Sequence, residues 1–458
     1  MKLEFIRGVV EGFYGIPWSW QERKDIIKFM AKRKYNLYIY APKEDEYHRE
    51  FWRKQYPAEF MEEFKKLNDC GIENSVNVSV ALSPGLSLVH ADESERDCLV
   101  DKFMKFAEIG VKTFCLFLDD IPEQLQHEQD KNKFSTLAEA QVYYTNSVYD
   151  LMKSKVEDLK FILCPTFYFG KTVNEYHFTL GKGINPEIEI MWTGPEVCSE
   201  IISAEDAKMI SDAYCRPVLY WDNYPVNDSA MVPELHIGPY SNRDKELNKY
   251  SSGIILNPMN QAYASMIVLD NAADYLDFEE NFNLKESWIK SLEFFGKESS
   301  EEFIEFANAN LKSPLNKKTP EITTALLAEF KKLYSLRKRR EAAEYLKKFG
   351  KKTNYNYQKI KENIDINLFK DIEKWMEEYR GWGDILYKIG EIVISNLEMY
   401  QDIPLDEGID LAIKLNGQLE EMLKKAMEYE TFIFGDELLT FAMNRLKISK
   451  GLVGLYRY

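Results

Sequence analysis

Roughly the first 280 residues alternate short runs of β-forming residues with longer amphipathic stretches. This alternation is typical of parallel strands joined by helices, because a parallel connection needs a long crossover. Eight strands alternating with helices predict a (β/α)8 TIM barrel, an α/β fold that commonly occupies about 250 residues. The runs with strand character are residues 5–11, 37–41, 76–83, 113–119, 160–165, 188–193, 218–222 and 253–257.

Helical periodicity is clearest in the first half of this region. Apolar residues recur at spacings of three and four over residues 18–34, 58–70, 94–109 and 137–156. Residues 171–186 and 228–240 are irregular and are predicted to be loops. Long loops at the carboxyl ends of barrel strands commonly build active sites.

Beyond residue 283 the strand patterns stop and helical periodicity continues to the end of the chain. The sequence therefore predicts a catalytic barrel over residues 1–282 and an all-α helical bundle over residues 283–458. The apolar stripes of these helices need a partner surface. We expect the bundle to stabilise the barrel and consider it the surface through which a homodimer would form.

Charge and hydropathy exclude several classes of partner. Acidic residues outnumber basic ones by 75 to 59, so the net charge of −16 disfavours nucleic acid and anionic membranes. No apolar run approaches the roughly 18 residues that span a bilayer, and the first 15 residues lack a signal-peptide pattern. The sequence as given is expected to be cytoplasmic, and secreted if a signal peptide was trimmed from it.

The cysteines and histidines give no sign of a metal or a disulfide framework. The six cysteines are scattered without a CxxC pair, as is usual for reduced core thiols. The five histidines show no HxxxH spacing. We expect no metal and no other cofactor.

Two adjacent acids follow the buried run TFCLFL, and they are Asp119 and Asp120. Most Asp pairs cap helices or occupy surface turns. In a barrel, however, the end of a strand is where catalytic side chains enter the pocket. Polar residues follow other strands too, and would ring the same mouth as a carbohydrate pocket requires. They are Lys43, Tyr168, Asn223, Asp228 and Asn257.

These strand ends carry motifs that resemble glycoside hydrolase family 84, the β-N-acetylglucosaminidases that include the O-GlcNAcases. The motifs agree in order and spacing over nearly the whole barrel region, and the family's fold is a TIM barrel. They are GVVEGFYG (8–15), YAPKEDEYHRxFWR (40–53), ALSPG (81–85), DDIP (119–122), CPTxY (164–168), WTGP (192–195), WDNYPVND (221–228) and NP (257–258).

The resemblance implies a role for each matching residue. Asp119 would orient the 2-acetamido group of the substrate, and Asp120 would act as general acid and then as general base. Tyr168 and Asn223 would hydrogen-bond the acetamido group or the reacting centre. The sugar hydroxyls would be bound by Gly12 through its backbone, Lys43, Asp228 and Asn257. Trp192 and Trp221 are expected to shape the acetamido pocket, although a buried Trp is more often part of the core.

The adjacency of the two acids agrees with this division of roles. Neighbouring Cα atoms lie about 3.8 Å apart, so both carboxylates approach the sugar from one side. An ordinary retaining glycosidase places its carboxyls on opposite faces of the scissile bond, whereas a substrate-assisted enzyme uses the acetamido oxygen as its nucleophile.

The resemblance therefore implies a retaining, exo-acting β-N-acetylglucosaminidase that acts through an oxazoline intermediate. Its expected partner is a glycoprotein, glycopeptide or glycan that bears β-linked N-acetylglucosamine. Two alternatives stay open. One is a hexosaminidase that degrades free or mucin-type oligosaccharides, and the other is a glycan-binding protein without catalysis, against which the intact DD pair argues.

Overall fold

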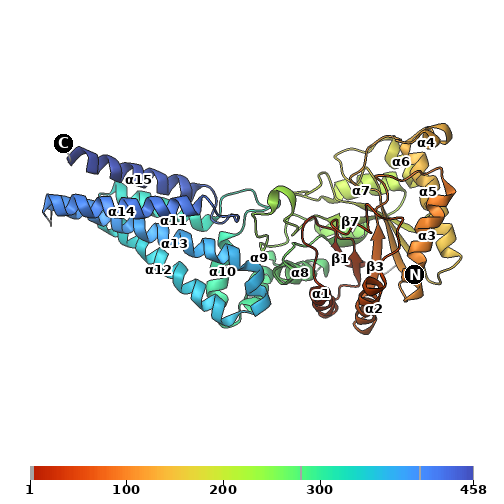
Figure 1. The fold of residues 1–458 in the computed structure, drawn as a ribbon, viewed down its shortest axis with the longest axis horizontal. Helices are drawn as coiled ribbons and strands as arrows, with labels where there is room; N and C mark the ends of the chain where they lie inside the picture. The colour runs from red at the N-terminus through yellow and green to blue at the C-terminus, as the bar shows by residue number, and fades with distance from the viewer. Residues whose placement is uncertain (1–4, 279–280, 402–403, 457–458) are drawn as a thin grey trace. The chain divides into compact units, whose positions relative to one another are not determined.

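The computed structural model describes residues 5–278, 281–401 and 404–456, and Figure 1 shows the course of the chain. The chain divides into two compact units, which are described separately below. The first unit comprises Met1–Ser229 and Pro239–Leu284, and the second comprises Ala230–Gly238 and Lys285–Tyr458. The predicted division between residues 282 and 283 did not anticipate that residues 230–238 belong to the second unit.

Eight parallel strands form a closed barrel in the first unit, in the order of the sequence. Strand β1 pairs with β2 through Gly8 and Leu37, and with β8 through Ile6 and Gly253, which closes the barrel. The predicted TIM barrel is confirmed. Its strands are β1 (Ile6–Glu11), β2 (Leu37–Tyr40), β3 (Asn77–Leu82), β4 (Thr113–Phe117), β5 (Lys160–Cys164), β6 (Ile188–Trp192), β7 (Val218–Asp222) and β8 (Ser251–Leu256).

The predicted strands differ from the observed ones at their ends. Asp119 and Asn257 were predicted as terminal strand residues, but β4 ends at Phe117 and β8 ends at Leu256. Shifts of one or two residues are ordinary at strand ends. Both side chains therefore lie on the loops that follow the strands, at the carboxyl end of the barrel.

Alternate residues of each strand fill the interior of the barrel. Val10, Ile39, Cys115, Met191 and Trp221 belong to one buried cluster inside it. Side chains on a strand point alternately to its two faces, so the residues between these positions face the surrounding helices. The packed interior closes the barrel, and ligands have access only to its mouth.

The helices of the first unit follow the strands as a TIM barrel requires. The four predicted helices are confirmed with shifted ends. The helix α1 begins after Ser19, whose side chain and that of Glu22 form a capping box. The helices are α1 (Trp20–Lys32), α2 (Ala58–Glu73), α3 (Glu93–Glu108), α4 (Glu128–Lys133), α5 (Leu137–Lys153), α6 (Glu175–Gly183), α7 (Ala204–Tyr214) and α8 (Ala262–Leu276).

The prediction of a loop over residues 171–186 is wrong, because the segment contains α6. Asn174 starts this helix by accepting a hydrogen bond from the backbone N–H of Tyr176 at 3.1 Å. Glycine in a helix lowers its intrinsic stability, and Gly181 obscured the helical pattern. A Cβ at Gly181 would lie 2.1 Å from the carbonyl oxygen of Ala213. Glycine at this position therefore permits the close packing of α6 on α7.

The second unit is a helical bundle, as predicted, and Figure 1 shows its long helices side by side. Aromatic rings link its parts: Tyr379 packs edge-on against Phe306 and stacks on Phe434. Across the three described stretches of the chain, no helix is long and apolar enough to cross a membrane. The bundle contains α9 (Leu284–Gly296), α10 (Ser300–Ala309), α11 (Glu321–Ser335), α12 (Arg339–Asn363), α13 (Ile366–Gln401), α14 (Leu405–Ala426) and α15 (Glu437–Tyr456).

A buried carboxylate makes the stability of the bundle depend on pH. Glu378 on α13 is 5% exposed and accepts hydrogen bonds from Thr431 at 2.7 Å and from the Trp382 indole at 3.0 Å. Burial raises the pKa of Glu378 to about 7. The folded state therefore holds a proton that the unfolded state releases between about pH 4.5 and 7, and this linkage lowers stability as pH rises through that window.

Glu378→Gln is expected to raise the free energy of unfolding at pH 8 by on the order of 1–3 kcal/mol, since no charge is then buried. The gain should vanish at about pH 3, well below the ordinary pKa of Glu, where the wild-type carboxyl is protonated in both states. Denaturant unfolding at the two pH values measures the difference. Glu373→Gln, an exposed change on the same helix, serves as the control. A gain that is the same at both pH values would contradict the account.

Candidate active site

A cavity of about 220 Å³ lies at the carboxyl end of the barrel strands, where the chain leaves each strand for a loop. The structure gathers there all the predicted site residues except Trp192. The predicted residues that line the cavity are Gly12, Lys43, Asp119, Asp120, Tyr168, Trp221, Asn223, Asp228 and Asn257.

Trp192 lies outside this cavity lining, which corrects the prediction for this residue. It is 1% exposed, and its ring packs against Tyr220 at a centroid distance of 5.9 Å. Its neighbour Met191 belongs to the barrel interior, so Trp192 points the other way, toward the helices. The prediction placed Trp192 correctly at the end of β6. Its side chain, however, lies on the face of the strand that is turned away from the cavity.

Asp119 forms a buried ion pair with Lys43, whose ammonium group donates to Asp119 Oδ2. Burial by itself would lower the pKa of Lys43, but the charges of Asp119 and Asp120 outweigh this effect and raise it. The ion pair therefore lies inside the site.

The second carboxylate oxygen of Asp119, unlike the one bound by Lys43, accepts no hydrogen bond from the described residues. Oδ1 is buried and has no hydrogen-bond partner among the described residues. A buried polar atom without a partner costs about 1–3 kcal/mol, so native proteins rarely keep one without a reason. The site therefore presents a free acceptor beside the ion pair.

Asp120 is held by two phenol groups. Its backbone is in the left-handed region, with φ of 53°, which Asp tolerates better than most residues. Tyr168 donates to Oδ1 at 2.8 Å and Tyr14 donates to Oδ2 at 2.9 Å. The side chain remains one-third exposed. The carboxylate is therefore fixed in direction and still open to the cavity.

Tyr14 was not predicted from the sequence, although it lies inside the EGFYG motif. Arg49 donates to its hydroxyl at 3.0 Å. Burial raises the pKa of Tyr14, and burial followed by the charge of Asp120 raises that of Tyr168. Both phenols therefore stay protonated and remain donors to Asp120. Thr193, Val197, Cys198, Val226 and Ser229 also line the cavity without having been predicted.

A chain of hydrogen-bonded amide side chains lines another part of the cavity. Asn223 Oδ1 accepts from the Trp221 indole at 2.8 Å and from Asn257 Nδ2 at 3.0 Å. Asn223 Nδ2 donates to the backbone carbonyl of Val197 at 2.7 Å. The backbone N–H of Gly12 donates to Asn257 Oδ1 at 3.3 Å. These bonds fix the orientation of the two amide groups, and therefore which of their atoms point into the cavity.

The predicted Asp228 and the unpredicted Cys164 also line the cavity. Asp228 Oδ2 accepts the backbone N–H of Tyr14 at 2.9 Å, and burial raises the pKa of Asp228. Cys164 is 1% exposed, and burial raises its pKa well above the ordinary value of a thiol. A neutral buried thiol is a poor nucleophile. Cys164 is therefore part of the cavity wall.

Gly12→Ala is expected to reduce activity by about 10- to 100-fold, since small displacements of site residues have effects of this size. A Cβ at Gly12 would lie 2.5 Å from Cζ2 of Trp221, so the indole would have to move and Asn223 with it. Steady-state kinetics on an aryl glycoside checks this. Gly417→Ala in α14 is the control, because nothing lies within 4 Å of the added Cβ. Unchanged kinetics for Gly12→Ala would show that Trp221 is not needed in its observed position.

Comparison with known proteins agrees with the geometry. The profile of the family described as beta-N-acetylglucosaminidase matches residues 7–308. Proteins described as Protein O-GlcNAcase from Rattus norvegicus and Mus musculus are each 34% identical over 285 residues, which cover 61% of this chain. The chain spans only 30% of the length of these curated relatives.

Two solved structures extend the similarity over almost the whole chain. A mutant of the O-GlcNAc hydrolase of Thermobaculum terrenum superposes with a TM-score of 0.92 at 35% identity, covering 98% of this chain and 95% of the other. The structure of CpGH84B superposes with a TM-score of 0.80 at 28% identity, covering 96% and 77% of the two chains. The likeness therefore includes the helical region as well as the barrel.

Proposed function

Since the chain belongs to the β-N-acetylglucosaminidase family, glycoside hydrolase family 84, we propose that it hydrolyses terminal β-linked N-acetylglucosamine by a retaining, substrate-assisted reaction. The observation that carries this proposal is the pair Asp119 and Asp120. One carboxylate is buried with a free acceptor oxygen, and its neighbour is held open to the cavity.

The free oxygen of Asp119 matches the N–H of a 2-acetamido group. Accepting this N–H satisfies Oδ1 and turns the acetamido carbonyl toward the anomeric carbon. As the carbonyl oxygen attacks, positive charge develops on the amide, and the adjacent carboxylate stabilises it. Lys43 holds the other oxygen of Asp119 and so fixes the orientation of the carboxylate.

Asp120 performs the proton transfers in this proposal. Its proton passes to the glycosidic oxygen as the bond from that oxygen to the anomeric carbon breaks, which leaves the oxazoline in its protonated form, with its N–H still donating to Asp119. Asp120 then removes a proton from water, which attacks the anomeric carbon from the face that the leaving group vacated. The ring opens and the acetamido group is restored, with net retention of configuration.

The remaining residues bind the sugar. Gly12 through its backbone, Lys43, Asp228 and Asn257 would contact the hydroxyl groups, and Tyr168 and Asn223 would contact the acetamido group or the reacting centre. Trp221 forms a wall of the acetamido pocket. A cavity of about 220 Å³ that ends in a packed barrel accommodates a terminal sugar unit, which supports exo action.

The relatives described as Protein O-GlcNAcase support N-acetylglucosamine on Ser or Thr as the physiological substrate of this chain. The competing substrate class is free or mucin-type glycans. A comparison of an O-GlcNAc-modified peptide with chitobiose distinguishes the two. A higher kcat/KM on the glycopeptide supports the proposal, and a higher kcat/KM on chitobiose favours a glycan-degrading enzyme.

The activity itself is tested with aryl glycosides. The aryl β-N-acetylglucosaminide should be hydrolysed, whereas the matching β-glucoside, which lacks the acetamido group, should show a far lower rate. Equal rates on both substrates would contradict the proposed reaction.

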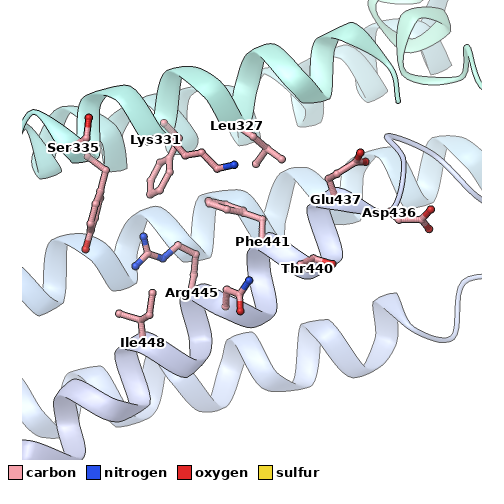
Figure 2. A pocket seen from close by; sticks show the side chains of 12 residues that line it. Leu327, Lys331, Ser335, Asp436, Glu437, Thr440, Phe441, Arg445 and Ile448 are labelled. Atoms are coloured by element: carbon pink, nitrogen blue, oxygen red, sulfur yellow. The ribbon is translucent and has the colours of Figure 1, made fainter. Parts of the chain in front are cut away.

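For the helical bundle we propose homodimerisation through a groove between α11 and α15. The groove encloses about 580 Å³, and Figure 2 shows Leu327 and Lys331 of α11 opposite Phe441 and Arg445 of α15. Acidic Asp436 and Glu437 line the groove near the start of α15, whereas Arg445 lies two turns further along. Two copies related by a two-fold axis would place the acidic end of one groove against the basic end of the other.

Sedimentation velocity tests this assembly. The wild-type chain should sediment as a dimer at micromolar concentration, and Phe441→Glu should shift it to a monomer. Met427→Glu, at an exposed residue outside the groove lining, should leave the dimer intact. A wild-type monomer at high concentration rejects the assembly.

A further inference from the structure

The connection between β2 and α2 carries two arginines of one sequence motif, and they are bonded in different ways. Arg53 forms an ion pair with Glu95 and donates to Ser87 Oγ at 2.9 Å and to the Ser87 carbonyl at 2.8 Å. These bonds tie the connection to its neighbours at the surface of the barrel unit. Arg49 instead donates to the hydroxyl of Tyr14, a residue that lines the cavity.

The bonds of Arg49 lead to the catalytic pair. Its Nη1 donates to the Tyr14 hydroxyl at 3.0 Å, and its Nη2 reaches the backbone carbonyl of Asp120 at 3.5 Å. Its Nε is buried and has no hydrogen-bond partner among the described residues. A buried donor without a partner lowers stability, so the stability of this connection alone does not account for the place of Arg49.

Tyr14 has its backbone fixed by other loops of the barrel mouth. Its N–H donates to Asp228 Oδ2 at 2.9 Å, and its carbonyl accepts from Asn260 Nδ2 at 3.1 Å. The phenol donates to Asp120 Oδ2 at 2.9 Å. The phenol oxygen therefore lies between the guanidinium of Arg49 on one side and the carboxylate of Asp120 on the other.

This arrangement decides which group donates to which. A phenol has one proton to donate and accepts through its lone pairs, and a protonated carboxyl also becomes a donor. Without Arg49, the hydroxyl of Tyr14 could accept the proton of Asp120. The guanidinium is always charged and occupies the acceptor side of that hydroxyl. The Tyr14 O–H therefore stays turned toward Asp120, and the proton of Asp120 remains free for another acceptor.

We propose that Arg49 is a positioning residue for proton transfer: through Tyr14, it keeps the proton of Asp120 directed at the glycosidic oxygen. Arg49 lies outside the cavity lining, so it acts on the general acid and does not touch the sugar. This inference rests on the proposed role of Asp120 as general acid.

The test is the dependence of kcat/KM on the leaving group in Arg49→Met. A nitrophenolate departs without a proton, so hydrolysis of the nitrophenyl β-N-acetylglucosaminide should change little. An alkoxide needs the proton, and kcat/KM on an alkyl β-N-acetylglucosaminide should fall by about 10-fold, the effect of one hydrogen bond from a charged donor. Arg49→Lys keeps a charged donor and should recover part of this loss.

A double-mutant cycle with Tyr14→Phe shows whether Arg49 acts through the phenol. Tyr14→Phe removes the hydroxyl that links the two groups. In this background Arg49→Met should cause no further loss on the alkyl glycoside. If Arg49→Met does not fold, Arg49→Lys takes its place in the same cycle.

Arg53→Met is the matched control, because it removes an arginine of the same connection that is bonded to Glu95 and Ser87. It should lower the melting temperature and leave the ratio of the two kcat/KM values, nitrophenyl to alkyl, unchanged.

Two results would overturn the positioning role alone. One is an equal effect of Arg49→Met on both leaving groups while Asp120→Ala still discriminates between them. The other is a pair of losses that multiply independently in the double mutant with Tyr14→Phe. If Asp120→Ala itself does not discriminate between the leaving groups, Asp120 is not the general acid, and the role of Arg49 falls with it.

Discussion

Asp120→Ala is expected to lose about 10²- to 10⁴-fold in kcat/KM on a seryl or alkyl β-N-acetylglucosaminide, and far less on a nitrophenyl one. An alkoxide is a poor leaving group, so the bond to it breaks only with a proton from Asp120. A nitrophenolate departs without protonation. The Asp120 carboxylate lies at the cavity, and Tyr14 and Tyr168 each donate a hydrogen bond to one of its oxygens. Asp120 is therefore held in place to supply this proton.

A series of aryl glycosides with graded leaving-group pKa measures this effect. The logarithm of kcat/KM for Asp120→Ala should fall steeply as the leaving-group pKa rises, while the wild-type line stays shallow. Parallel lines for the two proteins would show that Asp120 is not the general acid.

Asp119→Asn is expected to lose about 10²- to 10³-fold in kcat/KM on every member of the same series, the range seen when one stabilising group at a developing charge is removed. Charge develops on the acetamido group during ring closure whatever the leaving group is. Asn keeps the shape of the side chain but removes the negative charge beside that amide, and it also leaves Lys43 without its buried partner.

Two further measurements separate this effect from damage to the fold. Thermal unfolding reports the stability lost with the ion pair. Binding of a thiazoline-type bicyclic inhibitor, which resembles the oxazoline, should weaken in Asp119→Asn much more than binding of N-acetylglucosamine does. A loss confined to poor leaving groups would mean that the roles of the two acids are exchanged.

Much of the barrel could be predicted because its pattern is local. Each strand is a short apolar run. In each of the first helices, apolar residues recur at spacings of three and four, which a single sequence is enough to reveal. The same reasoning places polar residues such as Asp119 and Asn257 at strand ends, and therefore at one mouth. The chemical roles of these residues came from the family resemblance, since spacing alone does not assign an acid or a base.

The features that were missed depend on tertiary contacts. The face on which Trp192 lies is set by the register of β6, and one residue decides between the interior and the helices. The helix α6 contains Gly181, which only the close approach of α7 explains. Residues 230–238 have no pattern of their own, and their bonds to Trp375 and Trp288 join positions more than 50 residues apart in the chain.

The claim that the acetamido group of the substrate is the nucleophile can be tested on the substrate itself. Nitrophenyl β-glycosides with mono-, di- and trifluoroacetamido groups carry amide oxygens of decreasing nucleophilicity at nearly constant size. The account predicts that kcat/KM of the wild-type enzyme falls with each added fluorine. A kcat/KM that stays constant across the series would contradict it, because the amide oxygen would then take no part in breaking the glycosidic bond.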